Sequence, residues 1–291
     1  MNSFKKIGLF TSSVNSEKIF IAQQIEEILD SKGCEVIYDS TFKKSSKKRN
    51  IKTYSKKYLN SNCDLVIAIG GDGTMLSCSR LYGLEAIPIL GINLGKLGFL
   101  TDIAPNELTT KLQEVLSGKY TLDKRFFLET TIKGDRKRHI ALNEVVIHSG
   151  AIAQLIEYDL FIDNVFVFRQ KADGIIISSP TGSTAYSLSG GGPIVHPSLD
   201  AISIVPMFPH SLSSSPLVVN AKSHIRIVTV GKKNKTSLSF DSHNSLNMPG
   251  ENEINISKSS SVLNLLHPIG HDFYDGCRNK LGWSSSITRQ K

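Results

Sequence analysis

The sequence predicts an α/β N-terminal domain with a doubly wound, mostly parallel sheet, plus a C-terminal β-rich, antiparallel domain. Within residues 1–124, short apolar runs alternate with segments of helical spacing, and strands that alternate with helices form parallel sheets covered on both faces. After residue 124, β-type segments follow one another closely, with turn residues such as Asp163-Asn164 between them. The 291 residues are enough for two domains that each bury a core.

The domain boundaries follow from this change of texture. Residues 1–124 are expected to form the α/β domain, and residues 125–271 the β-rich domain. Residues 272–291 are expected to form a tail that packs back on the first domain and contains a short helix. No internal repeat is visible in the sequence.

The predicted strands of the first domain are short apolar runs, which comprise residues 5–11, 35–38, 65–69 and 87–93. The predicted helices place apolar residues three and four positions apart, and comprise residues 17–32, a segment after Thr74, and residues 105–117. Gly33 and Gly118 follow the first and last of these helices, where a helix-terminating glycine is common.

The second domain is predicted to consist almost entirely of strands. The expected strands comprise residues 127–132, 142–148, 155–162, 165–168, 175–178, 202–205, 217–219, 225–230, 238–240, 253–256 and 262–266. Gly134-Asp135 is a further hairpin-turn candidate in this part of the chain.

The segment that organises the first domain is the turn Gly70-Gly71-Asp72-Gly73-Thr74, between an apolar strand and a helix. A helix N-terminus provides unpaired N–H groups and a partial positive charge, which suit phosphate. A carboxylate repels phosphate, so in a phosphate site Asp72 makes sense if the site also holds a hydroxyl or a metal ion. The alternative is a plain turn that joins strand to helix, and neither common nucleotide-binding glycine motif is present.

Two stretches of the second domain carry polar groups in unusual contexts. Asn143-Glu144 interrupts an apolar strand, and adjacent strand residues face opposite sides. A buried amide or carboxylate costs free energy unless it is paired, and sugar hydroxyls are suitable partners; the alternative is a strand edge with both groups in water. Residues 181–192 are rich in glycine and hydroxyl side chains, and residues 182–189 are expected to open a helix. One interpretation of the segment is a ligand site in which Tyr186 stacks on a base. The alternative is a loop of helix caps and turns, which has the same composition.

The composition argues against several classes of protein. No apolar run approaches the roughly 20 residues that a membrane helix requires, and residues 7–10 are too short for a signal-peptide core. We therefore expect a cytoplasmic location and no membrane partner. The four cysteines are scattered, without a Cys-x-x-Cys pair, and the histidines show no His-Glu-x-x-His pattern. A zinc site, a disulfide framework or a transition-metal enzyme is therefore not expected.

The net charge of +8 arises in one segment. Residues 43–57 contain eight basic residues and no acidic residue; without these eight, the basic residues equal the 26 acidic ones in number. The simplest interpretation is a solvated loop. The alternative is an anion-contacting arm for nucleic acid or polyphosphate groups. A nucleic-acid partner rests on this segment alone and is not expected.

These features together resemble the NAD kinase family, and the resemblance covers most of the chain. The matching stretches are Gly70-Gly71-Asp72-Gly73-Thr74, Leu97-Gly98-Phe99-Leu100-Thr101, Asn143-Glu144, Asp173-Gly174, Thr181-Gly182-Ser183-Thr184-Ala185-Tyr186 and Pro206-Met207-Phe208-Pro209-His210. The glycine turn alone is not specific, because 6-phosphofructokinases and lipid kinases carry a similar one. The Asn-Glu pair together with the threonine- and glycine-rich run is specific.

The resemblance implies ATP-dependent phosphorylation of the adenosine ribose 2′-hydroxyl of NAD to give NADP, with a divalent metal ion, usually Mg²⁺, and a homo-oligomer, either a dimer or a tetramer. Asp72 is implied as the catalytic base or hydroxyl orienter. The implied phosphate- and ATP-binding residues are Gly70, Gly71, Gly73 and Thr74. The implied NAD-binding residues are Gly73, Phe99, Asn143, Glu144, Asp173, Thr184, Ala185, Tyr186 and Ser189, with Lys171 and Asp241 as further possibilities, so that residues 125–271 are the NAD-binding domain.

Two other classes of function remain open at this point. One is a lipid kinase with the same glycine turn, which would need an apolar surface for the membrane that no segment provides. The other is a binding or regulatory protein that keeps the nucleotide site without catalysis, against which the intact Asp72 argues.

Overall fold

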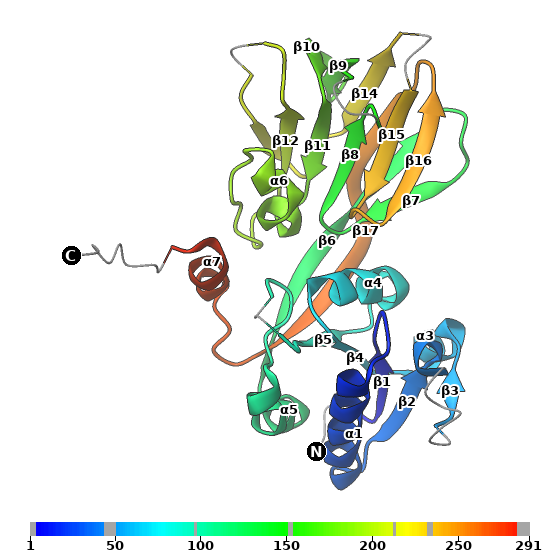
Figure 1. Ribbon diagram of the computed structural model, residues 1–291, viewed down its shortest axis with the longest axis vertical. Helices are drawn as coiled ribbons and strands as arrows, with labels where there is room; N and C mark the ends of the chain where they lie inside the picture. Colours follow the sequence, from blue (N-terminus) through cyan, green and yellow to red (C-terminus); the bar gives the residue numbers. More distant parts are fainter. Residues whose placement is uncertain are drawn as a thin grey trace, which may run out of the picture. The chain divides into compact units, whose positions relative to one another are not determined.

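The computed structural model describes residues 4–43, 51–95, 98–150, 154–211, 214–231 and 235–283 (Figure 1). Contacts within the chain define two compact units. The first unit consists of residues 1–124 and 263–291, and the second of residues 125–262. Two strands, β6 (Tyr120–Ile132) and β17 (Glu253–Pro268), have residues in both units. The functional division into residues 1–124, 125–271 and 272–291 stays a prediction.

The sheet of the first unit is parallel, with the strand order β17-β5-β4-β1-β2-β3. Besides β17, the strands of this sheet are β1 (Lys6–Phe10), β2 (Glu35–Asp39), β3 (Thr53–Tyr54), β4 (Leu65–Ile69) and β5 (Ile89–Ile92). All five residues of β4 are buried, as expected for a central strand covered on both faces. The carboxyl ends of β1, β4 and β5 therefore lie at one edge of the sheet.

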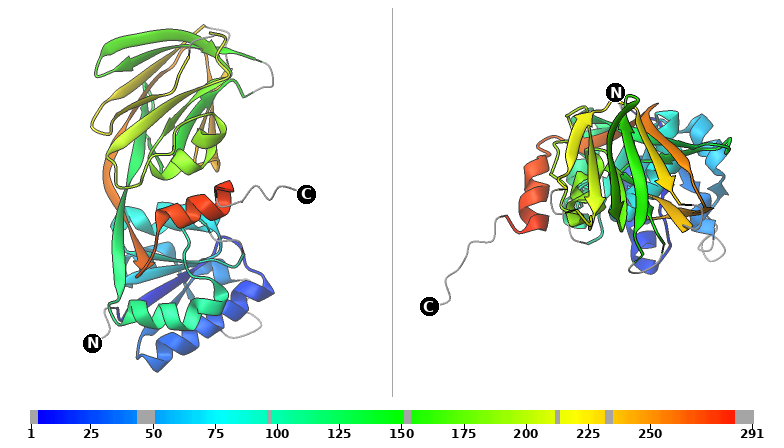
Figure 2. Two further views of the ribbon diagram at one scale, coloured as in Figure 1. Left: turned by 90° about the vertical axis from the view of Figure 1, so that its left-hand side faces the viewer. Right: turned by 90° about the horizontal axis from the view of Figure 1, so that it is seen from above.

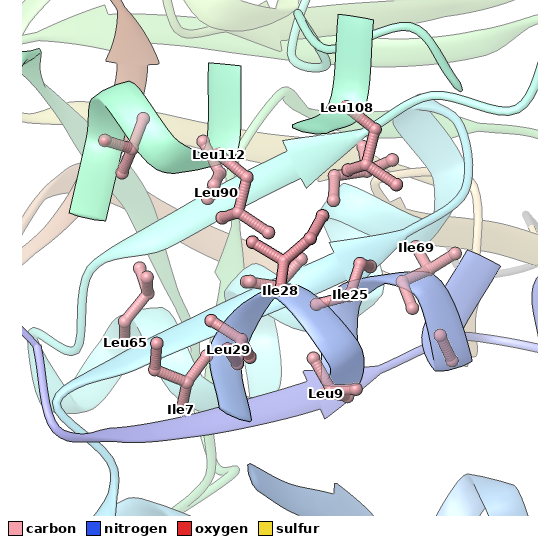
Figure 3. Close-up of a cluster of buried hydrophobic side chains, with 14 of the residues drawn as sticks. Ile7, Leu9, Ile25, Ile28, Leu29, Leu65, Ile69, Leu90, Leu108 and Leu112 are labelled. Carbon is pink, nitrogen blue, oxygen red and sulfur yellow. The ribbon is translucent and has the colours of Figure 1, made fainter. Parts of the chain in front are cut away.

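Helices cover both faces of this sheet. Ile7 and Leu9 of β1 pack in the same cluster as α1 (Ser16–Ser31) and α5 (Leu108–Leu116), and Figure 3 shows the side chains of these elements pointing toward one another. The alternate residues of β1 face the other way. Gly8 lies against Leu59 of α3 (Lys56–Asn62), and the ring of Phe10 contacts that of Tyr82 in α4 (Asp72–Tyr82). This arrangement confirms the predicted doubly wound α/β fold.

Helix α1 illustrates how the local sequence sets an element. Asn15 caps its N-terminus, because the side-chain oxygen accepts a hydrogen bond from the N–H of Lys18 at 2.9 Å. The buried residues Ile21, Ala22, Ile25, Ile28 and Leu29 recur at helical spacing. Gly33 has a φ of +70° just after the helix, a conformation that glycine adopts readily. The described part of the unit also contains the short 3₁₀ helices η1 (Ser40–Phe42), η2 (Gly83–Glu85) and η3 (Pro105–Glu107).

The basic segment differs from the predicted solvated loop in its last part. Residues 44–50 lie outside the described residues, but Thr53–Tyr54 forms strand β3 and Lys56 begins α3. The hydroxyl of Ser55 caps α3 by accepting from the N–H of Tyr58 at 3.3 Å. The rings of Tyr54 and Tyr58 stack with centroids 4.4 Å apart, and Leu59 is fully buried. The prediction of a solvated loop rested on the charge pattern of residues 43–57. The structure shows that contacts of Tyr54, Tyr58 and Leu59 order the end of this segment.

The second unit is an antiparallel β structure with a core between two layers of strands (Figure 1). One layer has the order β13-β12-β11-β8-β15-β16, formed by β13 (Leu217–Asn220), β12 (Ala201–Met207), β11 (Gly174–Ser178), β8 (Glu144–His148), β15 (Lys235–Phe240) and β16 (Asn244–Pro249). The other layer includes β7 (Arg138–Ala141), β9 (Ile156–Ile162), β10 (Val165–Ala172) and β14 (Ile225–Val230), with parts of β6 and β17. The predicted antiparallel β-rich domain is thus confirmed.

A glycine- and serine-rich segment lies on the outer face of the six-stranded layer. Val146, Ile176, Val205 and Met207 form a small apolar cluster apart from the main core. An added Cβ at Gly190 would come within 3.0 Å of Ile176 and 3.3 Å of Val205. The short helices η4 (Thr181–Thr184) and α6 (Tyr186–Ser189) belong to this segment and are drawn in yellow-green in Figure 2. The red helix in the same figure is α7 (Phe273–Leu281), which belongs to the first unit.

Several strands are longer than predicted, and β6 and β17 differ most. β6 begins at Tyr120 rather than at residue 127, and β17 is one strand where two were expected at residues 253–256 and 262–266. The serine-rich centre of β17 breaks the apolar pattern, yet the Nζ of Lys258 lies 4.9 Å from the ring of Phe126 and Ser259 is buried. Strands β7 and β16 were not predicted as separate elements. Among the described residues, no helix is long and apolar enough to cross a bilayer.

Candidate active site

The glycine turn follows β4 at the carboxyl edge of the parallel sheet. Gly70 has a φ of +148°, and a Cβ there would collide with the hydroxyl of Thr74, so only glycine fits. Helix α4 begins at Asp72 with Gly71 as its N-cap, and no side chain of the described residues caps it. A Cβ at Gly71 or Gly73 would meet no atom of these residues within 4 Å. As far as the structure describes the chain, the helix N-terminus therefore has room for a ligand, and no side chain caps its N–H groups.

Asp72 is held by a second loop that the sequence analysis did not connect to it. The N–H of Phe99 donates to Oδ2 at 3.0 Å, and the N–H of Leu100 donates to Oδ1 at 3.1 Å. A Cβ at Gly98 would collide with Oδ1 of Asp72, so glycine is required for this close approach. A third donor is the ammonium group of Lys280, which lies 2.9 Å from Oδ2. The carboxylate is therefore aimed by its surroundings rather than free to rotate.

Thr74 has a different environment from the one that its predicted phosphate role suggests. Its side chain is buried, and its hydroxyl is 2.8 Å from that of Ser12, which follows β1. The neighbouring Thr11 hydroxyl lies within hydrogen-bonding distance of the carbonyl oxygen of Ile69, at 2.9 Å. These contacts connect the ends of β1 and β4. The side chain of Thr74 thus supports the turn, and a phosphate contact of this residue stays a prediction.

A cluster of one aspartate and two histidines lies beyond the loop that holds Asp72, with His267 buried, Asp102 partly buried and His271 exposed. The carboxylate of Asp102 accepts a hydrogen bond from Nδ1 of His267 and lies 2.9 Å from Nδ1 of His271. Burial alone would lower the pKa of His267, but Asp102 and Asp123 outweigh it and raise the pKa to about 9. Burial would raise the pKa of Asp102, yet the two histidines lower it to about 2.

The same cluster provides three potential metal-ligand atoms within 4.8 Å of one another. The rings of His267 and His271 stack, however, with an interplanar angle of 11° and centroids 3.9 Å apart. A coordinated ion lies close to the plane of each imidazole, at about 2.0–2.1 Å from its nitrogen, and one ion does not satisfy this for two stacked rings. We therefore interpret the cluster as hydrogen-bonded support. A cavity of about 280 Å³, with Phe99 and Asp102 on its wall, adjoins it.

In the second unit, Asn143 and Glu144 are buried, with exposed fractions of 8% and 2%. Oδ1 of Asn143 and Oε2 of Glu144 are buried and accept no hydrogen bond from the described residues. Burial rules out the alternative in which both groups sit in water at a strand edge. Unsatisfied buried acceptors are uncommon and costly, so they indicate a place where a ligand supplies donors.

Asp241 positions the backbone of this pair. Its carboxylate accepts hydrogen bonds from the N–H groups of Leu142 at 3.0 Å and Asn143 at 2.7 Å. Burial and the nearby charge of Asp241 raise the pKa of Glu144 to about 8, although a hydrogen bond from the N–H of Tyr186 opposes the change. Glu144 is therefore largely protonated at neutral pH. The sequence analysis placed Asp241 among possible ligand contacts and missed its backbone role.

The glycine- and serine-rich segment was predicted as a helix opening at residues 182–189, which is wrong in form. The 3₁₀ helix η4 covers Thr181–Thr184, and α6 is a single turn at Tyr186–Ser189. The two helices are separated at Ala185, whose φ of −104° and ψ of −130° lie outside the helical region. The hydroxyl of Ser183 donates to the carbonyl oxygen of Pro180 at 2.7 Å and lies 3.1 Å from that of Val195. Thr184 and Ala185 are partly buried, whereas Tyr186 and Ser189 are exposed.

The remaining predicted residues lie near the junction of β10 and β11. Asp173 is partly buried between these strands, and its N–H donates to the carbonyl of Met207 at 3.0 Å. Lys171 is exposed, with its Nζ 3.5 Å from a carboxylate oxygen of Glu157. Gly174 follows Asp173, and a Cβ there would collide with the carbonyl of Ile147. Asp173 thus immediately precedes a close contact between strands β11 and β8, and its ligand role stays a prediction.

The fold and the glycine turn define a class of protein: an α/β nucleotide-binding protein equipped for phosphoryl transfer. An uncapped helix N-terminus suits phosphate groups, and a held carboxylate beside it suits a hydroxyl that attacks phosphorus. Both lie at the carboxyl edge of a parallel sheet, where such folds bind ligands.

Comparison with known proteins places the chain within this class. Residues 7–120 match the model of the ATP-NAD kinase N-terminal domain, and residues 142–267 match that of the ATP-NAD kinase C-terminal domain. The NAD kinase of Teredinibacter turnerae is 44% identical over 290 residues, which cover 98% of this chain and 99% of that protein. The NAD kinase of Azotobacter vinelandii is 42% identical, and the match covers 99% of both chains. The chain belongs to the NAD kinase family.

Solved structures show the same similarity. Yeast NADH kinase in complex with NADH matches 99% of this chain and 90% of its own, with a TM-score of 0.88 and 27% identity. The NAD kinase of Archaeoglobus fulgidus in complex with ATP matches 95% of this chain and 97% of its own, with a TM-score of 0.74 and 25% identity. The resemblance noted from the sequence motifs is thus confirmed across both units.

Proposed function

We propose that this chain transfers a phosphoryl group from ATP to the 2′-hydroxyl of the adenosine ribose of NAD, which gives NADP. Membership of the NAD kinase family, with relatives matched over nearly their whole length, makes phosphorylation of NAD to NADP its reaction. The observation that carries the assignment of roles is the Asp72 carboxylate, which two backbone N–H groups hold at the start of α4.

Asp72 is the proposed base or hydroxyl orienter. A carboxylate has about four lone-pair sites, and three donors among the described residues already use Asp72: two on Oδ2 and one on Oδ1. The remaining site on Oδ1 accepts a hydrogen bond from the ribose hydroxyl. Catalysis of phosphoryl transfer depends mainly on positioning and electrostatic stabilisation, so a carboxylate with one oriented free site suits either role.

The turn residues Gly70, Gly71, Gly73 and Thr74 are the proposed phosphate-binding set. Open space at Gly71 and Gly73 supports this part of the proposal, because phosphate oxygens need to approach the backbone there. Gly70 makes the turn sterically possible, and Thr74 contributes through the start of the helix. A triphosphate is therefore oriented toward Asp72 by backbone groups.

A divalent ion, Mg²⁺, is proposed to accompany ATP. Mg²⁺ sites commonly combine one or two carboxylates with substrate phosphates and water, so a turn with the single carboxylate of Asp72 is compatible with an ion brought by the nucleotide. When bound, such an ion neutralises charge on the phosphates. We do not propose the cluster of Asp102, His267 and His271 as the Mg²⁺ site. Its two histidine rings are stacked, and imidazole nitrogens are poorly suited to an ion that prefers oxygen ligands.

The buried pair Asn143 and Glu144 is the proposed site for ribose hydroxyls of NAD. Their unpaired oxygens accept hydrogen bonds, and each sugar hydroxyl donates one. Tyr186 is 41% exposed, which leaves its ring available to stack on adenine. Further proposed NAD contacts are Gly73, Phe99, Asp173, Thr184, Ala185 and Ser189, with Lys171 as a possible one. Asp241 is proposed to act through the backbone of Asn143.

A homo-oligomer, either a dimer or a tetramer, is also proposed. Val165, Phe166 and Val167 are exposed in succession on β10, and neighbouring exposed apolar residues commonly mark interfaces. Phe166→Asp should lower the molar mass measured by light scattering. Phe20→Asp changes an exposed phenylalanine of α1 and serves as the control. A monomeric wild-type protein would contradict the proposal. The cytoplasmic location stays a prediction.

The reaction is tested by incubating the purified protein with NAD, ATP and Mg²⁺ and measuring NADP with an NADP-specific dehydrogenase. We expect NADP to form, and 2′-deoxy-NAD to bind without being phosphorylated. A site built around polar groups of a ligand rejects analogues that lack them by as much as about 10⁴-fold. Binding of NAD without NADP formation would instead indicate a regulatory protein, and phosphorylation of dispersed diacylglycerol a lipid kinase.

A further inference from the structure

The C-terminal helix α7 (Phe273–Leu281) contributes a charged group to the glycine turn. Nζ of Lys280 lies 2.9 Å from Oδ2 of Asp72, although the two residues are 208 positions apart in sequence. Their side chains are 27% and 32% exposed, so this pair is partly shielded from water. An isolated surface pair would contribute little, but here the acceptor is the proposed catalytic carboxylate.

The Lys280 side chain is held in this position by Phe99. Its Nζ lies 4.7 Å from the centre of the Phe99 ring, a distance typical of a cation–π contact. Gly276 of α7 packs on the same ring, since a Cβ there would lie 3.2 Å from it. The N–H of Phe99 in turn donates to Asp72. One residue thus contacts the lysine, the helix that carries it and the carboxylate.

Two further contacts anchor the segment that leads into α7. His267 and His271 both bond to Asp102, which follows the loop that holds Asp72. Arg278, another cation of α7, bonds to Asp272 at 2.9 Å and to Asp275. These contacts of Arg278 stay within α7 and its N-cap residue, whereas Lys280 is the cation of this helix that reaches Asp72.

We propose that Lys280 is a positioning residue for phosphoryl transfer. It bonds to Oδ2 of Asp72, which also accepts from Phe99, and so leaves the free site of the carboxylate on Oδ1. The substrate hydroxyl then meets one oxygen in one orientation. This inference rests on the proposed role of Asp72 and adds the C-terminal helix to the active site.

The variants Lys280→Met and Lys280→Arg test this proposal. Lys280→Met keeps the chain length without the charge and should lower kcat about 10- to 100-fold, because small misplacements of reacting groups have effects of this size. KM for NAD and for ATP should stay within about threefold. Lys280→Arg keeps a cation and should restore most of kcat. Arg278→Met removes a cation from the same helix and should leave kcat unchanged.

A double-mutant comparison separates positioning from support of the fold. In an Asp72→Asn background, where residual NADP is measured by an end-point assay at high enzyme concentration, Lys280→Met should have no further effect. An equal loss in both backgrounds would overturn the proposal, as would full activity of Lys280→Met in a wild-type background. If Lys280→Met does not fold, Lys280→Gln replaces it. Absence of NADP from the wild type would instead contradict the proposed function itself.

Discussion

The carboxylate of Asp241 accepts a hydrogen bond of 2.7 Å from the backbone N–H of Asn143, 98 residues earlier in the chain. The same carboxylate accepts from the N–H of Leu142, and Asp241 is itself 1% exposed. Asp241 adopts a φ of +50°, in the left-handed region, where aspartate is among the more tolerated residues. The predicted ligand-binding pair is thus oriented by a hairpin turn from elsewhere in the second unit.

Asp241→Asn should weaken NAD binding although Asp241 is proposed to act through the backbone of Asn143 and not by direct contact with NAD. The amide NH₂ would face one of the backbone N–H groups, and a buried donor without an acceptor costs about 1–3 kcal/mol. We expect a fall of that size in the free energy of unfolding and a rise in KM for NAD of about 10-fold. Asp135→Asn is the control, because Asp135 accepts from the N–H of Lys137 at an exposed turn. An unchanged KM would limit Asp241 to a role in stability.

Asp72→Asn should reduce kcat by about 10²–10⁴-fold, the usual range for loss of general-base help, while NAD affinity changes only a few-fold. The matched control is Asp64→Asn. Asp64 precedes β4 as Asp72 follows it, and its Oδ2 accepts from the N–H groups of Lys5 and Lys6 at 2.9 and 3.0 Å. Steady-state kinetics and isothermal titration calorimetry measure the two effects. Near-full activity of Asp72→Asn would reduce Asp72 to a turn residue.

Glu144→Gln should remove a pH dependence of stability. The pKa of Glu144 is raised from 4.5 to about 8, so the folded protein holds a proton that the unfolded chain releases. The stabilisation of the folded state by this proton is fully present below pH 4.5 and is lost as pH rises to 8. Over this range the free energy of unfolding falls by at most about 1.4 kcal/mol per pH unit. Denaturant unfolding at several pH values should show this slope in the wild type and its loss in Glu144→Gln.

The same residue predicts a proton linkage to NAD binding. Hydroxyl donors to Oε2 favour the carboxylate form, so NAD should release up to one proton on binding at neutral pH. Calorimetry in buffers of different ionisation enthalpy measures this release, which Glu144→Gln should abolish. Equal proton release by the variant would mean that Glu144 does not contact the nucleotide.

His267→Gln should change stability most below neutral pH. The pKa of His267 is raised from 6.5 to about 9, so its stabilising charge is fully present below pH 6.5 and is lost as pH rises through 9. Thermal unfolding should therefore show a larger loss in His267→Gln at pH 6 than at pH 9.5, by on the order of 2 kcal/mol. His224→Gln, at an exposed position, is the control. A loss independent of pH would indicate packing alone.

Much of the local structure could be predicted from the sequence. The five apolar residues of β4, the glycines after it and the helical spacing after Thr74 specify a strand, a turn and a helix start. The length of β17 could not be predicted, because the burial of Ser259 depends on neighbouring strands. The order at Thr53–Tyr54 was also missed, since an aromatic contact rather than the charge pattern produces it.

By itself the sequence determined the position of the glycine turn, the presence of Asp72 in it and the change from an α/β to a β-rich chain. These follow from apolar periodicity and from backbone conformations that glycine alone adopts, which are local properties. Only the tertiary structure decided what holds Asp72 and what buries Asn143 and Glu144. The donors to Asp72 are the backbone N–H groups of Phe99 and Leu100 and the side chain of Lys280, which is 208 positions away in the sequence. Every residue type except proline carries a backbone N–H donor, so no pattern of residue types in the sequence identifies the donors that bind Asp72. Only folding brings these donors and the carboxylate together.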